Sequence, residues 1–133
     1  MEVINLKDFH LTAIEHANDP RNMGPLREFN GHARITGPCG DTMEFWLQVH
    51  DGKIKKASFA TDGCDPSIAS GSMTTCLAEG KTIDAAKSIS QKEVLEALEG
   101  LPEESQHCAL LAVNTLKAAC DDYMEKQKRK ERI

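Results

Sequence analysis

The sequence predicts a pair of antiparallel strands in residues 42–61, which read TMEFWLQVHDGKIKKASFAT. Apolar and polar side chains alternate over residues 43–49, as they do in a strand that is buried on one face. Asp51-Gly52 is the kind of dipeptide that forms a two-residue hairpin turn. Residues 53–61 would then return alongside the first strand, so this stretch indicates a β-hairpin.

A further strand and a series of helices flank this hairpin. Residues 32–36 form a short strand-like run before Gly37-Pro38, and residues 5–17 carry apolar side chains at helical spacing. From Pro66 onward the pattern is helical. Strands followed by helices are typical of α+β proteins. We therefore expect a small three-stranded antiparallel sheet, in chain order, packed by an N-terminal helix and several C-terminal helices.

The helical region divides at start and stop signals. Pro66 suits the first turn of a helix, and Gly80 would end that helix. A short helix is expected from Thr82, and Ser90-Gln-Lys-Glu resembles a capping box that opens another. The last helix is expected from about Ser105 toward Lys128.

The length and composition are those of an ordinary globular protein. The chain has 133 residues, of which 40% are hydrophobic and 28% charged, so we expect one domain spanning residues 1–133. A formal charge of −5 argues against nucleic acid as a partner. The longest apolar run, residues 108–113, is too short to cross a membrane, and residues 1–7 show no signal-peptide pattern. A cytoplasmic protein is therefore expected.

The cysteines are expected to be reduced thiols, because their number is odd and no export signal is visible. They are Cys39, Cys64, Cys76, Cys108 and Cys120. None belongs to a C-x-x-C pair, which argues against zinc ribbons and thioredoxin-type sites. Cys76 and Cys120 lie inside helical patterns, so we expect them to pack as small hydrophobic residues.

Two of the cysteines are expected to lie close together. Cys39 lies in the turn between the first two strands, and Cys64 follows the third strand. The hairpin places the start of the second strand and the end of the third at the same edge of the sheet. Cys108 opens the last helix, and it joins them if that helix begins at the same end. Asp41 and His107 are the nearest additional ligands.

The other two cysteines lie too far along their helices to join this group. Each is twelve residues beyond a predicted site cysteine, which is roughly 18 Å along a helix. Three thiols with Asp41 and His107 suit a soft metal or an iron–sulfur cluster. The same residues also suit a closed tetrahedral zinc site. Helix N-termini favour negative charge, so Cys64 and Cys108 are expected to ionise readily.

Several short motifs occur in a characteristic order along the chain. They are Asn18-Asp-Pro-Arg-Asn-Met-Gly24, Pro38-Cys-Gly-Asp41, Gly63-Cys64 with Ile68-Ala-Ser70, Gly80-Lys81, and Leu101-Pro102 before His107-Cys108. Together they resemble the IscU/NifU-type iron–sulfur cluster assembly scaffolds over nearly the whole chain. The family's sheet-and-helix fold agrees with the one expected above. The resemblance implies that Cys39, Asp41, Cys64, His107 and Cys108 form the assembly site.

The resemblance also implies a mechanism. A cysteine desulfurase passes sulfur as a persulfide to a scaffold thiol, chiefly the one matching Cys108. A ferredoxin-like donor supplies electrons, and a [2Fe–2S] cluster forms from iron and sulfide and is handed to recipient apo-proteins. The scaffold is then a carrier rather than an enzyme. Zinc is an alternative occupant of the cluster-free site, and a homodimer is an option for the loaded form.

The chain departs from the family pattern at two places. Leu101-Pro-Glu-Glu-Ser105 stands where bacterial and mitochondrial members carry Leu-Pro-Pro-Val-Lys, the segment that a dedicated heat-shock chaperone recognises. Asp65-Pro-Ser67 replaces the Gly-Ser-Ala that commonly follows the second cysteine. The sequence leaves open whether Asp41 or His107 is the fourth ligand. It also leaves a zinc-binding, sulfurtransferase-like sulfur relay as the alternative function.

Overall fold

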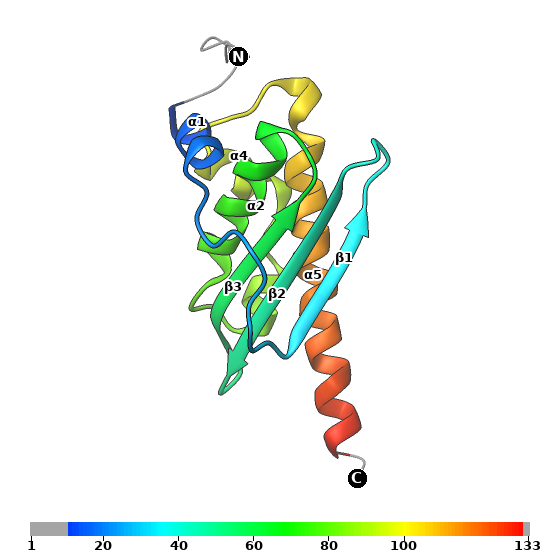
Figure 1. The fold of residues 1–133 in the computed structure, drawn as a ribbon. Coiled ribbons are helices and arrows are strands. Elements are labelled where there is room, and N and C mark those ends of the chain that lie inside the picture. Colours follow the sequence, from blue (N-terminus) through cyan, green and yellow to red (C-terminus); the bar gives the residue numbers. More distant parts are fainter. Residues whose placement is uncertain (1–10, 132–133) are drawn as a thin grey trace.

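The computed structural model describes residues 11–131, and Figure 1 shows the arrangement of its helices and strands. The elements are α1 (Leu11–Asn18), β1 (Gly31–Thr36), β2 (Thr42–His50), β3 (Lys53–Thr61), α2 (Asp65–Ala78), α3 (Ile83–Lys87), α4 (Gln91–Ala97), the 3-10 helix η1 (Glu103–Ser105) and α5 (His107–Glu131). The predicted α+β class is confirmed. No helix within the described range is long and apolar enough to cross a membrane.

The sheet has the predicted topology. Its strands are antiparallel in the order β1-β2-β3, and Phe45 in the central strand pairs with Ala33 on one side and Phe59 on the other. Asp51 and Gly52 both have positive φ angles, 54° and 75°, which is the backbone of a type I′ hairpin turn. This turn matches the right-handed twist of the strands that it joins.

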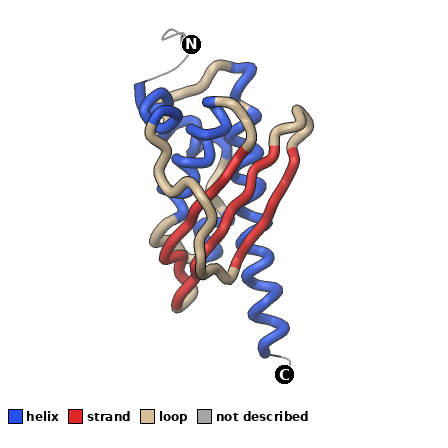
Figure 2. The backbone as a smooth tube through the Cα atoms, viewed as in Figure 1, coloured by secondary structure: helices blue, strands red, loops and turns tan. Residues whose placement is uncertain are grey.

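The helices lie on one face of the sheet (Figure 2). α5 packs against β1 and β2, while α2 packs against β3 and α5. The apolar side chains of β2 that alternate in the sequence, including Met43, Phe45 and Leu47, are fully buried in the resulting core. Helix packing therefore follows from the alternation that predicted the strand.

The segment between α1 and β1 adds to the free edge of β3. Met23 forms a parallel bridge with Phe59, where Phe59 N donates to Asn22 O at 2.9 Å and Gly24 N donates to Phe59 O at 2.7 Å. On the other face of the sheet from Phe45, Trp46 is only 8% exposed. The alternation in β2 puts Trp46 opposite the helices, and the structure nevertheless shows it to be buried.

α2 is rich in small and polar side chains, and it is packed closely on three sides, by α1, β3 and α5. A Cβ atom on Gly71 would lie 2.3 Å from Cδ2 of Phe59, so only glycine fits at this position. His16 of α1 is buried, and its Nδ1 lies 2.7 Å from Ser72 Oγ. The side-chain oxygens of Ser70 and Thr74 are buried and have no hydrogen-bond partner within the described part of the chain.

Most helix boundaries lie within a few residues of their predicted positions. The capping box is confirmed, because Ser90 Oγ accepts from Glu93 N at 3.1 Å and Glu93 Oε1 accepts from Ser90 N at 3.3 Å. The last helix begins at His107, two residues later than expected, because η1 occupies the residues before it. Of the helix predicted at 5–17, residues 5–10 lie outside the described range.

Candidate functional site

Three connections meet at the same end of the molecule. Figure 1 shows the β1–β2 turn, the junction between β3 and α2, and the first turn of α5 at this end. These connections carry all five residues that the sequence assigned to the site. The assumption that α5 begins beside the sheet edge of Cys39 and Cys64 is therefore correct.

The turn between β1 and β2 presents Cys39 and Asp41. Gly37 N donates to Asp41 O at 2.8 Å, and Gly40 N donates to Gly37 O at 3.0 Å, so the turn is closed by its own backbone. Gly40 has a φ of 93°, a backbone conformation that residues other than glycine rarely adopt. This tight turn leaves Cys39 exposed to solvent.

Cys64 occupies the N-cap position of α2 and is also exposed. Its carbonyl oxygen accepts hydrogen bonds from Ser67 N at 2.9 Å and from Ile68 N at 3.1 Å, which starts the helix. The preceding loop is tied to β2, because Asp62 Oδ1 accepts from Thr42 N at 2.7 Å. The Asp62 side chain thus holds the loop that leads into Cys64 next to the start of β2.

His107 and Cys108 form the first turn of α5. Cys108 is only 2% exposed, and its Sγ lies 3.8 Å from Nε2 of His107. The helix start is braced by α4, since the Gln91 side chain donates to the Gln106 carbonyl at 3.0 Å. Cys108 is therefore inside the molecule at the site, whereas Cys39 and Cys64 are at its surface.

Ser67 links two of the predicted site residues, and sequence reasoning missed it. Its Oγ lies 3.4 Å from Asp41 Oδ2 and 3.4 Å from Cys108 Sγ. The available signal was the departure at Asp65-Pro-Ser67, where a serine follows the second cysteine by three residues. Because Ser67 lies three residues after the N-cap residue Cys64, the two residues lie on the same side of the first turn of α2.

Burial above all raises the pKa of Cys108. Its hydrogen bond with Ser67 opposes this shift, while the charges of Cys64, Asp41 and Cys39 raise the pKa further. The expectation that the start of α5 lets Cys108 ionise readily is therefore wrong for this structure, because desolvation outweighs the favourable helix terminus. Cys39, Asp41 and Cys64 therefore lie close enough to Cys108 for their charges to affect its pKa.

The five residues are gathered but do not form a closed ligand shell. Within residues 11–131, no three or more His, Cys, Asp or Glu side chains are arranged so that they could hold a metal ion. Asp41, Cys108 and His107 are connected through direct contacts and through Ser67. Cys39 and Cys64 are exposed at the surface of the site. For all three thiols to bind one metal centre, the side chains of Cys39 and Cys64 must turn toward Cys108.

The two cysteines that were expected to pack as hydrophobic residues behave differently. Cys120 is fully buried in the apolar core, as expected. Cys76 is exposed, so the prediction for it is wrong. The cause is its position on α2: the neighbouring Thr74, Thr75 and Ala78 take the buried face of the helix, and Cys76 lies on the opposite face.

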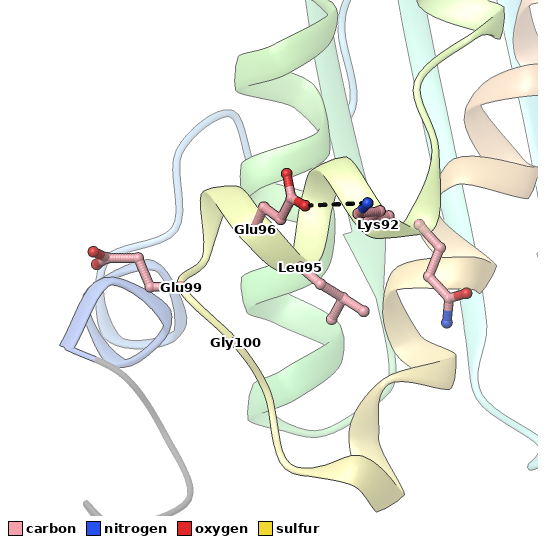
Figure 3. A pocket seen from close by; sticks show the side chains of 6 residues that line it. Lys92, Leu95, Glu96, Glu99 and Gly100 are labelled. Carbon is pink, nitrogen blue, oxygen red and sulfur yellow. Dashed lines mark ion pairs between the residues drawn. The ribbon is translucent and has the colours of Figure 1, made fainter.

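An open hollow of about 390 Å³ lies elsewhere on the surface, along α4 and the turn that follows it. Figure 3 shows Lys92, Leu95, Glu96, Glu99 and Gly100 around it, and Lys92 Nζ pairs with Glu96 Oε1 at 3.8 Å. Its lining contains no cysteine or histidine. The chemistry of a soft metal therefore belongs to the thiol-bearing end of the molecule.

The geometry defines a class of protein: a small α+β protein with three thiols, a carboxylate and an imidazole at one end of its sheet. Residues 8–130 match the family model described as "NifU-like N terminal domain". The chain belongs to this family, which confirms the resemblance seen in the sequence.

Curated relatives carry names that agree with this family. The chain is 39% identical over 121 residues to "Iron-sulfur cluster assembly scaffold protein IscU 1" of Archaeoglobus fulgidus, covering 90% of this chain and 79% of the relative. It is 39% identical over 122 residues to the IscU scaffold protein of Escherichia coli strain K12, covering 88% and 94%. A Drosophila melanogaster relative, 38% identical over 92% of this chain and 82% of its own length, is named an assembly enzyme.

Solved structures share the fold. The N-terminal part of a NifU-like protein from Brucella abortus aligns with a TM-score of 0.69 at 20% identity, covering 88% of this chain and 94% of that chain. A scaffold protein from Fervidobacterium islandicum aligns with a TM-score of 0.69 at 15% identity, covering 87% and 98%. None of these names describes a zinc-dependent sulfur relay, so that alternative is not favoured.

Proposed function

We propose that this protein is a scaffold on which an iron–sulfur cluster is assembled and from which it passes to recipient apo-proteins. One observation carries the proposal: the buried Ser67 hydroxyl joins Asp41 to Cys108, at the end of the molecule that also holds Cys39 and Cys64. Membership of the NifU-like family and relatives named as scaffolds support it. The whole chain would act as one scaffold domain.

The ligands of the cluster would be three thiolates and one further group. Cys39, Cys64 and Cys108 supply the thiolates that iron–sulfur clusters prefer. We assign Asp41 as the fourth ligand, because its carboxylate shares a hydrogen-bonding partner with Cys108. His107, whose Nε2 lies 3.8 Å from Cys108 Sγ, would hold iron before the cluster is complete. A mixed ligand set of this kind suits a cluster that must be released.

Sulfur would arrive from a cysteine desulfurase. The Cys108 thiolate attacks the outer sulfur of the donor's persulfide, the sulfur–sulfur bond of the donor breaks, and the donor leaves as a thiolate. Two electrons from a ferredoxin-like protein then cleave the new Cys108 persulfide into sulfide and the free thiolate. Because Cys108 is 2% exposed, the first turn of α5 must move to admit the donor.

Two iron ions and two sulfide ions would give a [2Fe–2S] cluster as the cargo. The scaffold thiols are restored when the cluster leaves, and no small molecule is turned over by the scaffold itself. In this scheme the protein is a carrier and not an enzyme. Zinc would compete for the same ligands, because it also favours thiolates.

Anaerobic reconstitution tests the proposal. The protein is incubated with ferrous iron, cysteine, a cysteine desulfurase and a reducing agent that supplies the electrons for persulfide reduction, and its visible absorption, iron and acid-labile sulfide are measured. We expect charge-transfer bands with nearly equal amounts of iron and sulfide. Tightly held zinc and no colour, even after treatment with a chelator, would refute the proposed function.

A single substitution separates a cluster scaffold from a sulfur relay. Cys39→Ser should leave persulfide formation on Cys108 intact but abolish the cluster, because one thiolate ligand is lost. Cys76→Ser is the matched control, since Cys76 is also an exposed thiol but lies about three helical turns beyond Cys64 on α2. A normal cluster in Cys39→Ser would contradict the assignment of Cys39 as a ligand.

A further inference from the structure

A buried serine contacts two residues of the proposed ligand set. Ser67 has no exposed surface, and its Oγ lies 3.4 Å from both Asp41 Oδ2 and Cys108 Sγ. Asp41 belongs to the β1–β2 turn and Cys108 to the first turn of α5, which are far apart in the sequence. One hydroxyl therefore fixes the position of one segment relative to the other.

The surroundings of Ser67 hold its hydroxyl in place. Its backbone N donates to Cys64 O at 2.9 Å, which anchors it in the first turn of α2. A Cβ atom on Gly63 would lie 2.5 Å from Ser67 Oγ and 3.0 Å from Asp41 Oδ2. Glycine at position 63 therefore leaves the space in which the hydroxyl and the carboxylate meet.

We propose that Ser67 is a positioning residue that holds the Asp41 carboxylate beside the Cys108 sulfur and gives its hydrogen bond to that sulfur when a metal ion takes the Asp41 oxygen. A hydroxyl has one proton, so it donates to one acceptor at a time. When a metal ion takes the Asp41 oxygen, the proton becomes available to the Cys108 sulfur. The inference rests on the ligand set of the proposed function and adds a residue to that site.

Cobalt(II) binding to the full chain tests this role without a cluster. Co²⁺ is titrated anaerobically into the reduced protein, and the thiolate-to-cobalt charge-transfer band reports both affinity and sulfur ligation. We expect Ser67→Ala to bind Co²⁺ about tenfold more weakly, which corresponds to about 1.4 kcal/mol. The band should also move to lower energy, because a sulfur without a hydrogen-bond donor gives up electron density more easily.

Ser70→Ala is the matched control. Ser70 is also buried on α2, and its hydroxyl has no hydrogen-bond partner in the part of the chain that the structure describes. Its removal should leave the cobalt affinity and the band unchanged. Alanine favours helix at both positions, so both variants should fold, which the fluorescence of Trp46 can verify.

The outcomes separate a positioning role from a structural one. Wild-type affinity and an unshifted band in Ser67→Ala would overturn the proposal. An equal loss of affinity in both variants, with no band shift, would also overturn it, because any buried hydroxyl of α2 would then have the same effect. Failure of the wild type to assemble a cluster would refute the proposed function, while the cobalt comparison would still decide the role of Ser67.

Discussion

α5 carries two buried cysteines in contrasting surroundings. Cys108, in its first turn, meets the Ser67 hydroxyl and the His107 imidazole. Cys120, farther along the helix, belongs to the apolar core, where burial and then the charge of Asp121 raise its pKa to about 12. Burial therefore does not separate the site thiol from the structural thiol. The site thiol is distinguished by the Ser67 hydroxyl, which reaches it from α2, and by the adjacent imidazole of His107.

α2 shows the same division between a polar end and a packed middle. Its start presents Cys64 and Ser67 to the site, whereas Gly71, farther along, lies against the ring of Phe59. Substitutions at the polar ends of both helices should change metal binding and sulfur chemistry. Substitutions in the packed middles should change the free energy of unfolding instead.

The largest expected effect concerns the two cysteines of α5. Cys108→Ser should lose nearly all cluster absorbance on reconstitution, because the site loses both a thiolate ligand and the sulfur acceptor. Cys120→Ala should assemble a normal cluster and lose about 1 kcal/mol of stability through the small cavity that it leaves. Reconstitution and urea unfolding, followed by Trp46 fluorescence, measure both. Equal loss of the cluster in the two variants would contradict the comparison.

Two glycines, Gly63 just before α2 and Gly71 in its middle, sharpen the same contrast. Gly71→Ala should lower the free energy of unfolding by about 1–3 kcal/mol, because its Cβ would overlap the Phe59 ring. Gly63→Ala should change stability less, but it should weaken Co²⁺ binding several-fold by displacing the Ser67 hydroxyl. Urea unfolding and cobalt titration of both variants check the pair. A reversed pattern would place the metal chemistry away from Ser67.

His16 of α1, which is buried against Ser72 in the middle of α2, should make the stability of the protein depend on pH. Burial above all, followed by the charge of Arg21, lowers the pKa of His16, while Glu15 opposes the shift. The unfolded chain therefore binds a proton at a higher pH than the folded one. Stability is fully present above the unfolded pKa of about 6.5 and falls as the pH drops below it, by at most about 1.4 kcal/mol per pH unit. Urea unfolding between pH 7.5 and about pH 5.5 measures this.

A His16→Gln variant provides the control for that measurement. Glutamine keeps a side chain that can hydrogen-bond to Ser72 but does not titrate in this range. The variant should lose less stability than the wild type as the pH falls. An identical pH dependence in the two proteins would show that other groups cause it.

The smallest expected effect concerns an unpaired hydroxyl of α2. Thr74 Oγ1 is buried and has no hydrogen-bond partner within residues 11–131. Thr74→Val replaces this hydroxyl with a methyl group of similar size, so the desolvation cost is removed. We expect stability to rise by up to about 1 kcal/mol with unchanged cluster assembly. A clear loss of stability on urea unfolding would show that the hydroxyl has a partner.

The sequence predicted the fold well because the signals were local. Alternation over residues 43–49 and the Asp51-Gly52 turn defined the hairpin, and the Ser90 capping box defined the start of α4. Exposure was harder to predict. Cys76 faces solvent because its helix is packed on the side of its small polar residues, which a search for apolar faces does not detect.

By itself, the sequence determined the strand order, the separation of Cys39, Cys64 and Cys108 from the other cysteines, and the family. These features depend on backbone periodicity, on helix rise and on ordered motifs, all of which can be read along the chain. Only the tertiary structure decided that Cys108 is buried and that Ser67 joins it to Asp41. Desolvation and contacts between distant segments arise from packing, and no local pattern in the sequence specifies them.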